Sequence, residues 1–99
     1  MPRISKGSIF LHGPGDDDSD VLFFEVVRST TNTCEIISLS KTIVGQSDMY
    51  QFVEPNQERK GKKLRCRVIS PSQIMLSENE HAILWDGLPV RQLIRIFLP

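Results

Sequence analysis

The chain has little of the residue types on which most catalytic and metal sites depend. Its 99 residues include two histidines, two cysteines, one tryptophan and one tyrosine. No GxSxG, HExxH or CxxC motif occurs, and "GPG" at 13–15 predicts a turn instead of a phosphate-binding loop. We therefore expect a non-enzymatic protein with no catalytic residue, no cofactor and no metal. The alternative is a small hydrolase in which His12 or His81 works with a carboxylate.

Long hydrophobic runs are also missing. No segment has the length of a membrane-spanning helix, and "MPRISKGSIF" has no apolar core of the kind that signal peptides carry. We expect a cytoplasmic protein that makes no membrane contact. Cys34 and Cys66 lie in segments of alternating apolar residues, so buried free thiols are expected, with a disulfide or a metal pair as the alternative.

The chain has no net charge, because 12 acidic residues balance 12 basic ones. The acids gather in a loop that could imitate an acidic partner surface, and a hard-cation loop is disfavoured there because no glutamate completes its pattern. The members of this loop are Asp16, Asp17, Asp18 and Asp20. The bases gather at 58–67, where we expect a patch for a partner or for phosphate. The candidate binding residues are Arg59, Lys60, Lys63, Arg65, Arg67, Tyr50, Trp85 and Asp86. The two clusters could instead compensate each other, and the pattern does not say which is the functional face.

The sequence does contain a series of short apolar runs, rich in β-branched and aromatic residues, between turn signals. The expected strands cover 7–12, 20–30, 34–44, 48–54, 62–68, 73–77 and 81–87. They predict an all-β class, as one small, strongly curved SH3-like barrel over 1–99. The segment 90–98 is ambiguous: Pro89 and the apolar spacing favour a short helix, and the β-branched residues favour a strand.

The alternation within two runs predicts which side chains enter the core. In 20–30, Leu22, Phe24 and Val26 are expected to face it, and Phe23 on the other face indicates a strand that is covered on both sides. In 62–68, the core face is expected to hold Leu64, Cys66 and Val68, and the other face holds Lys63, Arg65 and Arg67.

The segment "ENEHAILWDGLPVRQ" at 78–92 holds the only tryptophan. Asp86 and Gly87 predict a turn, and Pro89 stiffens the backbone after this turn. We expect Trp85 to pack over one end of the barrel with its indole N–H on a backbone carbonyl. A role as the edge that meets a partner is the alternative.

The order of these motifs resembles a family of small proteins encoded by bacteriophages and mobile elements. The matching positions are Gly7, Ile9, Phe10, Phe23, Phe24, Glu25, Val26, Val27, Leu64, Arg65, Arg67, Val68, Ala82, Trp85, Asp86, Gly87, Pro89 and Val90. The specific part is the A-x-x-W-D-G-x-P-V ending. This chain departs from the family at "HGPGDDDSD", where an aromatic "SWGYDQTN" loop is usual. The resemblance implies a phage or mobile-element origin and a bacterial host cell, and it transfers no activity.

These observations leave two main functional hypotheses. The first is an accessory protein that binds a host protein or a defence component as an inhibitor. The alternative is a nucleic-acid or nucleotide-binding module that uses the basic strand at 59–67. The apolar residues of 93–98 also predict a homodimer through the C-terminal segment, with docking onto a host protein as the rival.

Overall fold

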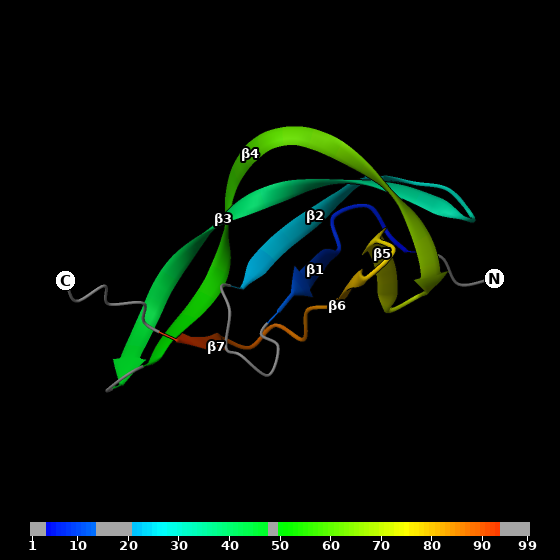
Figure 1. Cartoon of the computed structure of the whole chain (residues 1–99). Coiled ribbons are helices and arrows are strands. Elements are labelled where there is room, and N and C mark those ends of the chain that lie inside the picture. Colours follow the sequence, from blue (N-terminus) through cyan, green and yellow to red (C-terminus); the bar gives the residue numbers. More distant parts are fainter. Residues whose placement is uncertain (1–3, 14–20, 48–49, 94–99) are drawn as a thin grey trace.

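The structure is a computed structural model that describes residues 4–13, 21–47 and 50–93. Every regular element in this part of the chain is a strand, which confirms the predicted all-β class (Figure 1). The strands are β1 (Ile9–His12), β2 (Leu22–Ser29), β3 (Thr33–Ser47), β4 (Tyr50–Ser70), β5 (Gln73–Ser77), β6 (Glu80–Leu84) and β7 (Val90–Leu93). Within the described residues, no helix has the length and hydropathy that a membrane crossing requires.

The strands pair in a closed ring, so the predicted strong curvature is confirmed. All pairings are antiparallel and follow the order β3-β2-β1-β6-β5-β4, and a further pairing of β3 with β4 closes the circle. In Figure 1, β4 first runs beside the far half of β3 and then arches over the ring. The short β7 is added to the first residues of β4, where Tyr50 to Val53 pair with Leu93 to Val90.

The long β4 differs from the prediction of two separate strands at 48–54 and 62–68. The chain was expected to break at "PNQE", yet Pro55 continues the strand as the register partner of Lys41. Pro55 lies beyond the residues that β7 covers, so β4 has only one neighbour there. A proline is tolerated at such an edge because its missing N–H leaves no partner unsatisfied. The register then shifts by two residues around Gly61, between the pairs Ser38–Lys60 and Ile36–Leu64, and Gly61 has a φ of 75°.

Two apolar clusters lie on the two faces of β1 and β2, as expected for strands that are covered on both sides. The cluster inside the ring comprises Ile4, Phe10, Phe24, Val26, Cys34, Ile36, Cys66, Ile74 and Ala82. The second cluster comprises Leu11, Val21, Phe23, Leu39 and Val53. Because the clusters share two strands, they belong to one folding unit.

Two residues that were expected in the core are exposed. Leu22 pairs with His12, the last residue of β1, and its exposed fraction is 47%. Leu64 adjoins the register shift at Gly61, which turns the strand out of its regular alternation, and it is 51% exposed. Cys66 is buried and Val68 packs against the ring core, as predicted.

The segment that begins at Val90 was expected to form either a short helix or a strand, and the structure agrees with only one of the two. Val90 to Leu93 form the strand β7, so the predicted helix is wrong for these residues. Pairing with β4 gives this segment backbone partners that an isolated helix of eight residues would lack. The rest of the C-terminal segment, 94–98, and the acidic loop of Asp16, Asp17, Asp18 and Asp20 lie outside the described residues.

Candidate functional site

The basic strand segment projects arginines from the outer face of the ring. Cys34 and Cys66 face each other across β3 and β4, and both point into the core. Alternation along β4 therefore turns Arg65 and Arg67 outward, and both are exposed. Arg65 is the register partner of Glu35, and Arg67 is the partner of Thr33.

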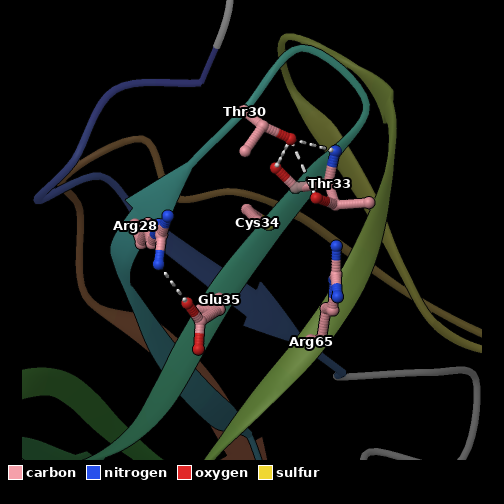
Figure 2. A pocket seen from close by; sticks show the side chains of 6 residues that line it. All are labelled: Arg28, Thr30, Thr33, Cys34, Glu35 and Arg65. Carbon is pink, nitrogen blue, oxygen red and sulfur yellow. Dashed lines mark hydrogen bonds and ion pairs between the residues drawn. The ribbon is translucent and has the colours of Figure 1, made fainter.

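A pocket of about 270 Å³ lies where the β2–β3 hairpin meets this part of β4 (Figure 2). Its lining includes Arg28 from β2, Glu35 from β3 and Arg65 from β4. Arg28 Nη1 lies 3.9 Å from Glu35 Oε1, a loose and exposed ion pair. The hydroxyls of Thr30 and Thr33 are 2.8 Å apart and hold the hairpin turn beside it.

Lys63 extends the same cluster on the other side of Arg28. It lines an adjoining pocket together with Arg28, Glu35 and the N-terminal residues Ile4 to Lys6. We call Arg28, Lys63, Arg65 and Arg67 the basic face. Glu35 is the carboxylate among them, so the face has a clear excess of positive charge. No ion pair links Lys63, Arg65 or Arg67 to any residue of the described part.

The register shift at Gly61 separates Arg59 and Lys60 from this face. Arg59 Nε donates a hydrogen bond to Glu25 Oε1 at 3.0 Å, so its charge is paired. Lys60 lines a different pocket, beside Leu22 and Phe23. The predicted patch is therefore divided. Arg28 and Glu35, which the sequence reasoning missed, join its larger part because the hairpin pairs them with each other.

The two candidate aromatic residues lie elsewhere. Trp85 packs edge-to-face on Phe23, with ring centroids 5.9 Å apart. Its Nε1 donates a hydrogen bond to the Leu88 carbonyl at 2.8 Å, which confirms the predicted structural role. Asp86 Oδ1 accepts the Leu88 N–H at 3.0 Å and so closes the predicted turn. Tyr50 stands at the other end of β4, with the Arg91 guanidinium 4.4 Å from its ring centroid.

The two histidines meet on β1 and β6. His12 Nε2 lies 3.1 Å from Glu80 Oε2, and His12 Nδ1 is 2.9 Å from the His81 carbonyl oxygen. The Ser77 hydroxyl donates to Glu80 Oε1 at 3.2 Å. Glu80 thus stands between the hydroxyl and the imidazole, whereas a catalytic triad needs the imidazole in the middle. Residues 4–13, 21–47 and 50–93 contain no group of three or more histidine, cysteine or acidic side chains that could hold a metal ion.

Both cysteines are buried free thiols, as predicted. Burial, with the nearby Cys66 as a smaller cause, raises the pKa of the Cys34 thiol from 9.0 to about 11. Burial also raises the pKa of the Cys66 thiol. At neutral pH both side chains therefore stay protonated and pack as small apolar groups.

A buried polar network, which the sequence reasoning also missed, fixes β7 against the ring. Gln92 Oε1 accepts hydrogen bonds from the Val21 N–H at 3.1 Å and from Lys41 Nζ at 2.8 Å. Lys41 Nζ also donates to the Val21 carbonyl at 2.8 Å, and Gln92 Nε2 donates to Gln51 Oε1 at 3.2 Å. A glutamine near a chain end gives no sequence signal for such a role.

No protein-family model, no curated protein and no solved structure matches this chain. The resemblance to the phage and mobile-element family and the likeness to an SH3 barrel therefore stay predictions. The functional assignment depends on the geometry of the basic face.

Proposed function

We propose that the protein is a non-enzymatic binding protein whose basic face docks onto an acidic surface of a partner protein. The observation that carries this proposal is the convergence of Arg28, Lys63, Arg65 and Arg67 from two strands onto one exposed surface. Among the described residues, Lys63, Arg65 and Arg67 form no ion pair, so these exposed cations are available to an external partner. Such charges speed the encounter of two proteins and fix their relative orientation.

The surroundings of the face favour a protein over a nucleic acid as the partner. Leu64 and Ile69 on the same strand are 51% and 43% exposed. Exposed aliphatic side chains beside arginines are typical of protein interfaces. Single-stranded nucleic acid usually stacks on aromatic platforms, and the described aromatic side chains all lie away from the basic face. The zero net charge of the chain also gives no long-range attraction to a polyanion.

The resemblance to phage and mobile-element proteins supports a host protein, or a component of a host defence pathway, as the partner. A small domain that covers an acidic surface of such a partner would act by occlusion, and hence as an inhibitor. This action needs no catalytic group, and it would take place in the cytoplasm of the bacterial host.

The experiment is affinity capture from a bacterial lysate with three proteins: the wild type, Arg65→Glu/Arg67→Glu, and Arg91→Glu as a charge-reversal control at the far end of β4. We expect one acidic protein at near-equal stoichiometry on the wild type and on the control. The double variant should lose it. Nucleic acid in the eluate, detected by ultraviolet absorbance and lost in the double variant, would instead make the basic face a nucleic-acid site. Equal capture by all three proteins would reject the basic face as the site.

A further inference from the structure

The middle of β4 has a strand on only one of its two sides. Over residues 54–66, β3 is the only strand of the described part of the chain that pairs with β4. On the other side, β7 reaches no further than Val53, and β5 begins to pair at Arg67. We call this uncovered side of residues 54–66 the open edge of β4, and it follows the arch of that strand in Figure 1. Residues 57–65 are all exposed, as an uncovered strand requires.

The hydrogen-bond pattern shows which backbone groups point out of the open edge. The Val68 N–H donates to the Asn32 carbonyl at 2.9 Å, so Val68 directs its backbone groups toward the β3 side. Successive residues of an antiparallel strand direct these groups to opposite sides, and those of Arg67 accordingly point toward β5, with which Arg67 pairs. The same alternation points the N–H and C=O groups of Arg65 and Lys63 out of the open edge, where no described strand meets them. Unpaired groups of this kind are a template for another extended chain.

The side chains beside these groups differ between the two faces of the strand. Lys63 and Arg65 project from one face and form no ion pair within the described residues. Leu64 lies on the other face and is 51% exposed. In a strand added to the edge, successive side chains would lie beside these three residues and alternate between the same two faces. The matching pattern therefore has acidic residues opposite the two cations and an apolar residue between them, beside Leu64.

The charge of the open edge disfavours a second copy of the same edge as its occupant. Two such edges side by side would bring Lys63 and Arg65 close to the same cations of the other copy. Like charges that face each other across two strands destabilise their pairing, and lysines are a common protection of an edge against it. The same cations attract an acidic strand, so the edge discriminates between the two occupants.

We propose that the open edge of β4 binds an extended segment of the partner protein, in which acidic and apolar residues alternate, as an added β-strand. This docking mode rests on the proposed function and adds to it the conformation and the residue pattern of the partner's acidic surface. Backbone hydrogen bonds from Lys63 and Arg65 would provide affinity, and the side chains would provide selectivity. An apolar residue of the partner would cover Leu64, which the ring core leaves exposed.

The test uses the full-length protein and a short probe peptide of alternating glutamate and valine with acetylated and amidated ends. We expect the peptide to slow the amide hydrogen exchange of Lys63 and Arg65, measured by NMR. The amide of Cys66 should not change, because it faces β3, opposite Cys34. Arg65→Glu should weaken binding about tenfold, whereas Arg91→Glu, a charge reversal on β7, should leave it unchanged.

Two N-methylated forms of the peptide separate strand addition from attraction between charges. Methyl groups on the glutamate nitrogens remove the N–H groups that would face Lys63 and Arg65. Methyl groups on the valine nitrogens lie on the far edge of the peptide and leave its charge the same. The first form should bind roughly ten- to a hundredfold more weakly than the parent peptide, because it loses backbone hydrogen bonds, and the second should bind as tightly as the parent.

Three results would overturn strand addition. Equal binding of all three peptides, weakened by Arg65→Glu, would show that charge alone binds them and would leave the proposed function in place. No binding of any peptide, while an acidic protein is still captured from the lysate, would have the same meaning. Slow exchange of Lys63 and Arg65 in the protein alone, increasing with its concentration, would assign the open edge to a second copy. If the lysate also yields no partner, the proposed function fails as well.

Discussion

Replacement of Gln92 by alanine should be one of the most damaging changes to a polar residue of this chain. Gln92 is 6% exposed, and its side-chain oxygen accepts from the Val21 N–H and from the Lys41 ammonium. The variant would leave the N–H of the fully buried Val21 without its acceptor. An unsatisfied buried donor costs about 1–3 kcal/mol, and a lost hydrogen bond to a charged group costs a similar amount. Lys41 keeps its hydrogen bond to the Val21 carbonyl in the variant, which limits the damage. We therefore expect the free energy of unfolding to fall by about 2–4 kcal/mol in total.

The assay is urea unfolding followed by the fluorescence of Trp85, which packs against the same cluster as Val21. In a thermal unfolding experiment, a loss of this much unfolding free energy should lower the melting temperature by roughly 10–25 °C in a domain of this length. Gln51→Ala is the matched control, since it removes only the 3.2 Å bond at the outer edge of the network and should cost less than about 1 kcal/mol. If Gln92→Ala unfolds within about 0.5 kcal/mol of the wild type, or no more easily than the control, the network does not fix β7.

Three further predictions concern the core and the turn. Phe10→Ala should cost about 3–5 kcal/mol in denaturant unfolding because Phe10 is fully buried, whereas Leu64→Ala at an exposed site should change little; similar costs would refute the ring core. Trp85→Phe should keep the ring contact and lose the hydrogen bond to the Leu88 carbonyl, which should lower the free energy of unfolding by about 1 kcal/mol, as followed by circular dichroism. An unchanged stability would show that this bond does not stabilise the fold. Between about pH 9 and 11 the unfolded chain binds fewer protons than the folded one, because the folded Cys34 keeps its proton to the higher pH. Stability should therefore fall with rising pH over this interval, and less steeply in Cys34→Ala; an equal slope would contradict the raised pKa.

The strand content was predictable because it depends on local chemistry. The alternation in β2 and the turn residues at 30–33 and 86–87 act over a few residues, and the structure has strands and turns there. The exposure of Leu22 and Leu64 was not predictable, because it depends on where β1 ends and where β4 shifts its register. The C-terminal strand β7 is another example, since its backbone partners come from a strand forty residues earlier in the chain.

The candidate site was also predictable only where local alternation determines it. Arg65 and Arg67 could be identified as outward residues from the alternation around Cys66. Their grouping with Arg28 could not, because it depends on the pairing of three strands. The ion pair between Arg59 and Glu25 could not be predicted either, because Glu25 lies on β2, far from Arg59 in the sequence.

The most direct test of the basic face as a docking surface is site-specific photocrosslinking. A photoreactive phenylalanine analogue replaces Leu64, between Lys63 and Arg65, or Ile43 at the far end of β3. These two sites form a matched pair, because their exposed fractions are 51% and 54%. Irradiation in the lysate should link position 64, and not position 43, to an acidic segment of one protein that peptide mass spectrometry identifies. Crosslinks from position 43 alone, or from position 64 to nucleic acid, would contradict the claim that this face binds an acidic protein.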